Sequence, residues 1–302
     1  MKKVLVGLLV VLLIGVISIA VVINATDDII SNTVGSHEKK VVKNEEIKKI
    51  ESSFISNTVD LHEKKVVNNE EINKLEIDFT STDIELQPSD DDRFIIELNG
   101  KVSEKLKDKF KLDVEEQNDV LKVEFQNQNT ISNIGVSIVD ITVSVSLPIK
   151  IYESITVNTA SGNIKTKDVQ ADKVSTSTAS GNITVDDQEA ITSSFEVASG
   201  NMYLTNVVGN VTAHSSSGNI TLHNEESSGN ISANASSGNI NIEYIKAPSS
   251  LYINFKATSG NGSVKLDGVS YEEKSNDRII GTIGSGDHEL IVDIISGNFK
   301  LR

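Results

Sequence analysis

The sequence predicts an all-β fold, a single-stranded β-helix or β-solenoid with coils of about 20 residues, preceded by one N-terminal transmembrane helix. Three observations lead to this prediction. An uninterrupted apolar run opens the chain, short segments of the first half alternate apolar and polar residues, and the tripeptide Ser-Gly-Asn recurs at nearly constant spacing through the second half. The first pattern is typical of a membrane span, the second of half-buried strands and the third of a repeat architecture.

The composition excludes several classes of protein. The chain has 302 residues, a formal net charge of −15, no cysteine and 4% aromatic residues. The absence of cysteine excludes a disulfide scaffold, a cysteine-ligated metal and a lipoprotein anchor. Nucleic-acid binding depends on Lys and Arg side chains that neutralise phosphates, so the acidic balance argues against nucleic acid as the partner. Few aromatic side chains leave few platforms on which sugars or bases could stack.

The run Val4–Ile23 contains twenty residues without a charge. At about 1.5 Å per residue such a helix spans roughly 30 Å, the thickness of the hydrocarbon layer. The run is longer than the apolar part of a cleaved signal, and the nearest candidate cleavage site lacks alanine at its first position. Lys2 and Lys3 precede it and Asp27 and Asp28 follow it, which places the N-terminus in the cytoplasm. We therefore expect a single-pass anchor in the lipid bilayer, with the C-terminal domain outside the cell.

Ile30–Phe54 and Ile55–Phe79 are a tandem duplication, with 18 of 25 aligned residues identical. At the end of the second copy Leu75, Ile77 and Phe79 alternate with Glu and Asp, as in a half-buried strand, whereas the first copy has a weaker apolar face. We infer that the second copy leads into the folded domain and that the first copy is a spacer. The expected organisation is an anchor over residues 1–24, a charged stalk over 25–71 and a β-solenoid over 72–302.

The segments that follow the duplication resemble further short strands bounded by Gly, Asn and Asp. Over Leu106–Val114 the apolar residues share one face, and Lys107, Lys109 and Lys111 share the other, so a strand is expected there. The other strands expected in this half are Thr82–Pro88, Arg93–Leu98, Val120–Phe125 and Val139–Leu147.

Ser-Gly-Asn divides the second half into repeats, with steps of 19, 19, 18, 20 and 22 residues between six of its copies. These six copies begin at Ser161, Ser180, Ser199, Ser217, Ser237 and Ser259. Further copies begin at Ser228 and Ser296, and Ser285-Gly286-Asp287 is a variant. In the first five repeats the residue after Asn is apolar: Ile164, Ile183, Met202, Ile220 and Ile240.

Each repeat is therefore expected to be a strand, a Ser-Gly-Asn corner and a second strand. Glycine supplies a positive φ at the corner without steric cost. Strands of neighbouring coils pair about 4.8 Å apart, so aliphatic columns fill the interior, and the Asn amides can form a hydrogen-bonded ladder. The longer interval near the end, with Ser270–Arg278, indicates a loop that leaves the last coils.

Three stretches carry a resemblance to a known family. They are Glu71–Asp92, Val145–Val169 with its Leu-Pro strand before the first Ser-Gly-Asn, and the recurring TASGNI and SSGNI units. Together they resemble the bacterial "putative adhesin" β-strand-repeat family, a domain of unknown function, from about Ile72 to Arg302. The resemblance implies an extracytoplasmic β-helical domain, and some relatives look like membrane-anchored accessory proteins of cell-envelope stress systems. The family has no agreed catalytic residues, so the resemblance implies none here.

No residue is assigned a catalytic, cofactor-binding or metal-binding role, and no cofactor is expected. His37 and His62 each begin His-Glu-Lys-Lys-Val, which lacks the second histidine of a zinc-protease motif. His214 and His223 lie in one coil region and could share a face, yet the pattern supplies no further ligands. Gly284-Ser285-Gly286-Asp287 matches only one unit of a calcium-binding repeat.

Two charged clusters stand out on the expected surface. The basic cluster is interpreted as a solvated strand face that discourages edge pairing, with contact to an anionic wall polymer or a lipid headgroup as the alternative. It comprises Lys101, Lys105, Lys107, Lys109 and Lys111. Asp90-Asp91-Asp92 is interpreted as a solvated turn, with a bridging calcium ion as the alternative.

We therefore expect a non-catalytic binding or scaffold module at the cell envelope, adhesin-like or accessory to envelope stress. A cell-wall polymer and a membrane protein, such as a sensor that the domain regulates, are the candidate partners. The alternative is a β-helix enzyme acting on polysaccharide, which requires a groove with two carboxylates within about 10 Å. The acidic residues of the coils are scattered through the sequence: Asp168, Asp186, Asp187, Glu196, Glu225, Glu226 and Glu243.

Overall fold

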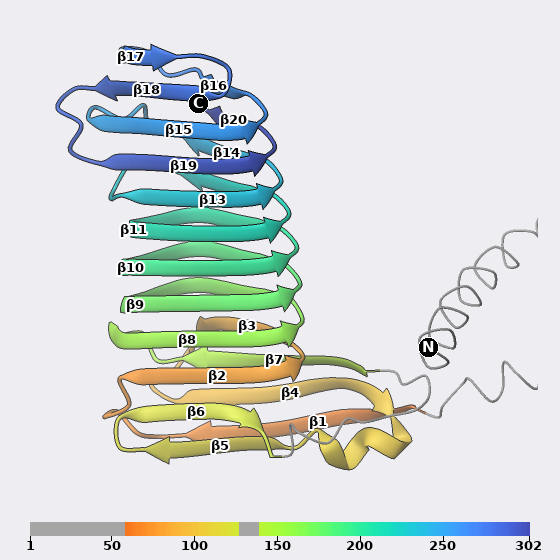
Figure 1. The fold of residues 1–302 in the computed structure, drawn as a ribbon. Coiled ribbons are helices and arrows are strands. Elements are labelled where there is room, and N and C mark those ends of the chain that lie inside the picture. The colour runs from red at the N-terminus through yellow and green to blue at the C-terminus, as the bar shows by residue number, and fades with distance from the viewer. Residues whose placement is uncertain (1–57, 127–138) are drawn as a thin grey trace, which may run out of the picture. The chain divides into compact units, whose positions relative to one another are not determined.

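The computed structural model describes residues 58–126 and 139–302, which form twenty strands and one short 3₁₀ helix. The strands stack into one solenoid (Figure 1), so the predicted all-β repeat fold is confirmed. Within these two ranges no helix has the length and apolarity that a membrane span requires. The predicted anchor at Val4–Ile23 lies outside the described residues and stays a prediction.

Two rows of paired strands run along the solenoid and are joined where strands turn from one row into the other. The front row is, in spatial order, β5 (Leu112–Gln117), β6 (Val120–Phe125), β2 (Lys74–Ser81), β8 (Tyr152–Ser161), β9 (Ile164–Ser180), β10 (Ile183–Ser199), β11 (Met202–Ser217), β13 (Ile231–Ser237), β19 (Glu289–Ser296), β15 (Leu251–Ser259), β18 (Arg278–Ile283) and β17 (Ser270–Lys274). The back row is β1 (Thr58–Val67), β4 (Phe94–Ser103), β7 (Val139–Leu147), β3 (Asp83–Pro88), the first residues of β9 to β11, β12 (Ile220–Asn224), β14 (Ile240–Tyr244), β20 (Phe299–Leu301) and β16 (Gly262–Val264).

The middle of the solenoid has the register that the repeat predicts. β9, β10 and β11 are parallel, and Ile183 of β10 lies between Ile164 and Met202 of its two neighbours. All three side chains are fully buried. Ile220, Ile240 and Phe299 continue the same column, which ends at Gly262, because the residues of paired parallel strands lie directly above one another. The aliphatic columns therefore form one continuous core.

The Ser-Gly-Asn corner requires glycine for two reasons. Gly162, Gly181 and Gly200 have φ values of 158°, 154° and 144°, which L side chains rarely adopt. In addition, a Cβ on Gly181 would lie 1.9 Å from the carbonyl oxygen of Gly162. Stacked corners thus leave no room for any side chain at this position.

The Asn residues of the corner form the predicted ladder. The backbone N–H of Asn182 donates to Asn163 Oδ1 at 3.0 Å, and Asn182 Nδ2 donates to the same oxygen at 3.2 Å. Asp83 Oδ1 accepts the backbone N–H of Asn163 at 2.7 Å and so begins the ladder without being part of a Ser-Gly-Asn unit. The ladder continues through Asn201, Asn219, Asn239, Asn298 and Asn261.

The folded domain begins earlier than the sequence indicates. β1 pairs antiparallel with β4 along its whole length, and Val59 and Leu61 pack against the core. Residues 58–67 therefore belong to the solenoid rather than to the stalk expected over 25–71. β1 was not predicted as a strand because many of its residues are charged. It is an edge strand, and the side chains of an edge strand are only partly covered, so such residues are tolerated there.

The strand expected over Leu106–Val114 is wrong in its first half. Glu104–Lys109 is the 3₁₀ helix η1, which buries Leu106, and β5 begins only at Leu112. Leu106 and Phe110 are both buried. A spacing of four residues puts two side chains on one face of a strand and also on one face of a helical turn, so the pattern alone does not distinguish them.

At the C-terminal end the order of coils in space departs from their order in the chain. β19 pairs with β13 on one side and with β15 on the other, so the last coil is inserted between two earlier coils. Ser270–Arg278, expected to be a loop, instead provides β17 and the start of β18, an antiparallel hairpin that covers the edge of β15. Unpaired strand edges are a liability, and the hairpin moves the free edge to a short polar strand (Figure 1).

Candidate functional site

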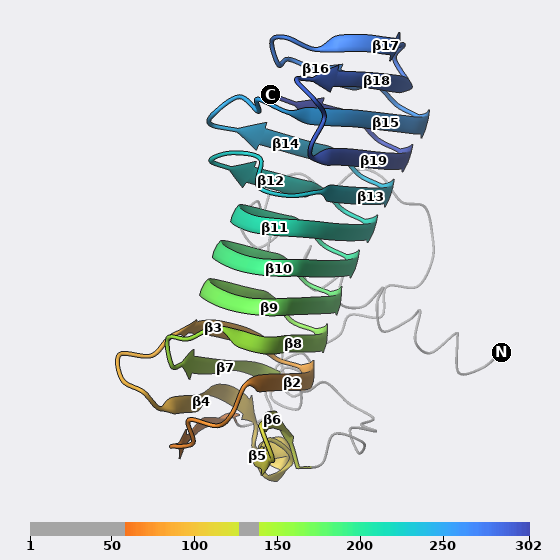
Figure 2. The ribbon, with the colours of Figure 1, turned by 90° about the vertical axis from the view of Figure 1, so that its left-hand side faces the viewer.

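A second column of turns lies where β9, β10 and β11 leave the back row, on the side of the solenoid turned to the viewer in Figure 2. Asp168, Asp187 and Asn206 occupy it, with φ values of 50°, 56° and 50°. Asp and Asn tolerate this left-handed conformation better than other residues with side chains. Asn206 Nδ2 donates to Asp187 Oδ1 at 2.9 Å, which ties neighbouring turns together.

After this turn each coil crosses a narrow third side before it enters the front row. Gln170 pairs with Glu189, and Glu189 pairs with Val208, so these exposed side chains form a column along the solenoid. The residues between them in the chain point inward: Val169, Ala171, Gln188, Ala190 and Val207 are all buried. The third side therefore differs chemically from coil to coil, although its backbone repeats.

A groove of about 590 Å³ runs along this side. Its floor spans the turns of three coils, and it is bounded by Pro148–Lys150 at one end and by Glu225, Glu226 and Ser228 at the other. Its lining includes the carboxylates of Asp168, Asp187 and Glu189 together with apolar atoms of Leu147, Ile149, Tyr152, Val169 and Val208. The groove is thus lined by both acidic and apolar residues.

Lys150 does not neutralise these carboxylates. Its Nζ donates to the backbone oxygen of Glu70 at 2.9 Å and to Asn73 Oδ1 at 3.4 Å, and it lies 5.3 Å from the centre of the Tyr152 ring. Partial burial lowers the pKa of Lys150. Burial raises the pKa of Tyr152, whose hydroxyl donates to the Pro148 oxygen at 2.9 Å. These contacts hold the loop at this end of the groove in place.

Two groove carboxylates form ion pairs and three do not. Lys246 Nζ lies 2.7 Å from Glu225 Oε1, and Lys167 Nζ lies 3.8 Å from Asp168 Oδ2. In the part of the chain that the structure describes, Asp187, Glu189 and Glu226 form no ion pair. The groove therefore keeps an excess of negative charge that the protein itself leaves uncompensated.

Gln188 lies between Asp187 and Glu189 in the chain, and its side chain points into the interior of the solenoid. Its side chain is 1% exposed, and its Nε2 donates to Ser193 Oγ at 2.8 Å. Its Oε1 has no hydrogen-bond partner. An unpaired buried acceptor costs free energy of about 1–3 kcal/mol, so this oxygen is unusual in a fold whose corner amides are paired in a ladder.

The histidines do not form a site within the described ranges. His62 Nδ1 lies 2.6 Å from Asn99 Oδ1, and His223 Nδ1 lies 3.3 Å from Glu243 Oε2. His214 and His223 do not share a face, because His214 pairs into the front row and His223 into the back row. His37 lies outside the described residues. Among those that are described, no three His, Asp or Glu side chains are arranged to hold a metal ion.

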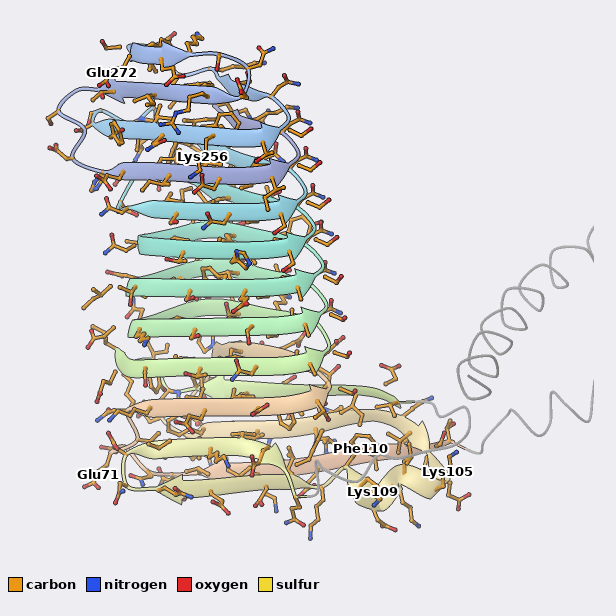
Figure 3. All side chains as sticks on the ribbon, in the orientation of Figure 1. Glu71, Lys105, Lys109, Phe110, Lys256 and Glu272 are labelled. Atoms are coloured by element: carbon orange, nitrogen blue, oxygen red, sulfur yellow. The ribbon has the colours of Figure 1, made fainter. Side chains whose placement is uncertain are left out.

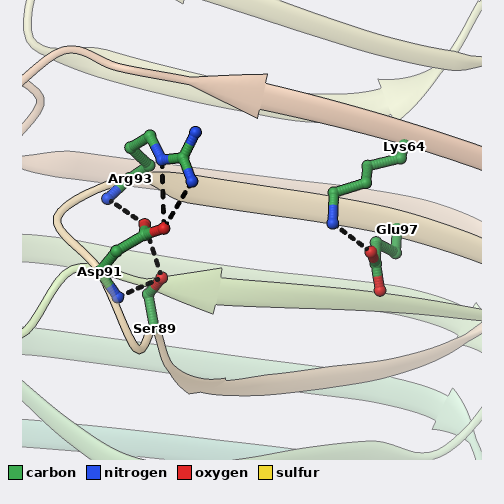
Figure 4. A network of polar contacts seen from close by, with 5 residues as sticks. All are labelled: Lys64, Ser89, Asp91, Arg93 and Glu97. Carbon is green, nitrogen blue, oxygen red and sulfur yellow. Dashed lines mark hydrogen bonds and ion pairs between the residues drawn. The ribbon is translucent and has the colours of Figure 1, made fainter.

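The two acidic turns considered as calcium sites are held by internal contacts. The Arg93 guanidinium forms two hydrogen bonds with Asp91 Oδ2, at 2.6 and 3.2 Å, and lowers the pKa of that carboxyl (Figure 4). In the second turn Asp287 Oδ2 accepts from Ser285 Oγ at 2.8 Å, and its backbone N–H donates to Ser250 Oγ at 2.8 Å. Both carboxylates stabilise turns.

The basic cluster gathers around η1, at the N-terminal end of the solenoid. Lys105 and Lys109 belong to η1 (Figure 3). Lys101 belongs to β4, and its Nζ lies 3.7 Å from Asp60 Oδ1. The cluster therefore combines residues of η1 with a residue near the end of β4, and it does not form the continuous strand face that was expected. Its contact with an anionic polymer or lipid stays a prediction.

Asp168 and Asp187 lie close enough together to meet the requirement for two neighbouring carboxylates in a carbohydrate-cleaving site. Residues on either side of them pair in β9 and β10, so the two turns lie about one strand spacing, ~4.8 Å, apart. Both side chains are exposed, whereas the acid catalyst of such enzymes occupies a desolvated, apolar position. The arrangement is better suited to attracting a charged ligand than to protonating a leaving group.

The sequence model of the family described as Toastrack DUF4097 matches residues 72–202 and 153–302 of the chain. No curated protein matches this chain. Similar solved structures include a "putative cell adhesion protein" from Clostridium sporogenes, 16% identical, covering 81% of this chain and 100% of that one with a TM-score of 0.39. A "putative adhesin" from Bacteroides fragilis is 14% identical, covering 80% and 97% with a TM-score of 0.42. A "Putative lipid binding protein" from Parabacteroides distasonis is 18% identical, covering 80% and 96% with a TM-score of 0.37.

Proposed function

Since the chain belongs to the Toastrack DUF4097 family, we propose that it is a non-catalytic binding module of the cell envelope that receives a protein partner in the groove of its third side. The observation that carries this proposal is the groove itself. It joins exposed carboxylates to exposed aliphatic residues over several coils, on a backbone that each coil holds in the same position. Rigid scaffolds with varied, exposed side chains are typical of recognition surfaces.

The groove favours a protein partner over an acidic wall polymer. Its carboxylates would repel an anionic polymer, and Lys150, the one lysine among its described lining residues, is engaged by Glu70 and Asn73. The basic cluster at η1 is the surface that suits an anionic polymer, and it would act separately. An accessory role in envelope stress would follow if the partner were a membrane-bound sensor.

Anchoring by Val4–Ile23 is part of the same proposal. A twenty-residue apolar run with lysines before it and aspartates after it supports an uncleaved, single-pass anchor with the solenoid outside the cell. Protease added to intact cells should remove the solenoid, and the chain should stay in the membrane fraction after carbonate extraction. A soluble chain of mature length beginning after Ile23 would contradict the anchor.

The groove can be tested by photo-crosslinking in cells that express the full chain. A benzophenone side chain at position 170, in the groove, should crosslink to one or a few envelope proteins. The control position is Tyr203, which is also exposed but lies on the back row outside the groove. Val208→Trp, which fills the groove, should abolish the crosslinks from position 170. Equal crosslinking from both positions would overturn the proposal.

Asp168 and Asp187 keep a carbohydrate-cleaving enzyme as the second candidate. This candidate predicts that the full chain releases reducing ends from an envelope or extracellular polysaccharide, and that Asp187→Asn abolishes the release. We expect no release from wild-type protein. Turnover that depends on Asp187 would replace the binding proposal with the enzyme.

A further inference from the structure

The groove selects a ligand by charge. Asp187 and Glu189 come from one coil, and Glu226 comes from the loop about two coils along, which is roughly 10 Å at the spacing of paired strands. In the described part of the chain none of the three forms an ion pair, although Lys246, which is paired with Glu225, is close enough to Glu226 for that carboxylate to help raise the lysine's pKa. Carboxylates that outnumber the neighbouring cations attract further cations.

Aliphatic side chains distinguish a peptide from a simple cation. Ile149 is 79% exposed, Ile151 is 68% exposed and Val208 is 43% exposed, and all three lie on or beside the groove. Exposed aliphatic residues beside carboxylates suit a ligand that alternates apolar and cationic groups. The groove spans five levels of the solenoid, about 20 Å, which an extended peptide covers with roughly six residues.

We propose that the groove binds an extended basic peptide segment. Lysine or arginine side chains of the segment lie against Asp187, Glu189 and Glu226, and its aliphatic side chains lie against Ile149 and Val208. This inference rests on the proposed function, because it names the chemistry of the partner that the groove receives.

The test uses the full chain in detergent micelles and a fluorescent heptapeptide that alternates leucine and lysine. We expect saturable binding by fluorescence anisotropy, and at least a tenfold rise in Kd for the triple variant Asp187→Asn, Glu189→Gln, Glu226→Gln. The control variant is Glu196→Gln, Asp267→Asn, Glu272→Gln, which removes the same charge from exposed residues outside the groove. Its Kd should change less than twofold.

Three outcomes would overturn the inference. They are equal losses in the two triple variants, binding as tight for a leucine–glutamate heptapeptide, or binding as tight for spermine, a cation without aliphatic side chains or a peptide backbone. These outcomes are distinct from failure of the proposed function. If the groove crosslinks persist and are lost with Val208→Trp while the heptapeptide does not bind, only the ligand class is wrong.

Discussion

The two kinds of turn in each coil are built from similar residues and do different work. At the Ser-Gly-Asn corner every coil repeats the same glycine and the same amide, and the amides bond to one another along the solenoid. At the groove the corresponding turns are Asp168, Asp187 and Asn206, and the residues after them vary. The first corner satisfies its own polar groups, whereas the second leaves the exposed carboxylates of Asp187 and Glu189 outside the described ion pairs. The difference separates the part that holds coils together from the part available to a partner.

The largest effect is expected at the corner glycine. Gly200→Ala would bring a Cβ within 1.9 Å of the Gly181 carbonyl oxygen at a positive φ, so we expect a loss of about 3–5 kcal/mol in unfolding free energy. Gly268→Ala is the control, because Gly268 has a φ of +76° with no atom within 4 Å. It should lose only about 1–2 kcal/mol. Urea unfolding followed by circular dichroism measures both, and similar losses would contradict the steric argument.

Next in size is the amide ladder. Asn201→Ala removes the oxygen that accepts from the backbone N–H and the Nδ2 of Asn219, and it removes the bond that Asn201 Nδ2 donates to Asn182, so we expect a loss of about 1–3 kcal/mol in unfolding free energy. Asn201→Asp keeps the acceptor, as Asp83 does at the start of the ladder, and should lose less. The same unfolding measurement ranks the two variants. An Asp variant that is less stable than the Ala variant would show that the ladder depends on donation from Nδ2.

A smaller effect on stability is expected at the groove turn. Asp187→Gly relieves a left-handed φ of 56° but loses the bond from Asn206, so the unfolding free energy should change by less than about 1 kcal/mol. Heptapeptide binding should weaken nonetheless. A loss above about 2 kcal/mol would mean that this turn, like the Ser-Gly-Asn corner, is structural, and it would remove the distinction drawn between them.

The smallest effect is expected from an ion pair on the back row, between the two kinds of turn. Glu243 accepts from Arg302 Nη2 at 2.7 Å and lies 3.3 Å from His223 Nδ1, and the Arg302 contact lowers the pKa of Glu243 below its ordinary value of 4.5. A lowered carboxyl pKa contributes stability above pH 4.5 that is lost as the pH falls through the folded-state value. Glu243→Gln should therefore lower the urea midpoint slightly at pH 7. At a pH below the folded pKa of Glu243 the two midpoints should coincide, and a difference that persisted there would contradict the electrostatic origin.

The regular coils could be predicted because their signal is a spacing. The corner glycines cannot be replaced, and their spacing of 19 residues predicts the length of a coil. The residues after each glycine then predict the amide ladder and the column of Ile164, Ile183 and Met202. The order of the last coils could not be predicted in this way. The units at Ser259 and Ser296 have the same tripeptide, and only tertiary packing decides that β19 lies between β13 and β15.

The groove was missed although a weak signal for it exists. Asp168, Asp187 and Asn206 are themselves 19 residues apart, and Asp and Asn are the residues that tolerate a left-handed turn. Read together, they predict a second corner and therefore a third side. The unpaired oxygen of Gln188 and the exposure of Val208 depend on how neighbouring coils pack, which no spacing in the sequence reports.

The position of β19 has a consequence for biogenesis. A ribosome delivers β13 and β15 before β19, yet in the finished protein these two strands are separated by the later one. If coils are added to the solenoid in chain order, β15 cannot pair with β13. The position between these two strands has to stay open until β19 is made. The strand that fills this position is translated some thirty residues after β15. A chain that ended before β19 would leave the edges of β13 and β15 without the strand that pairs with both, and unpaired strand edges invite aggregation.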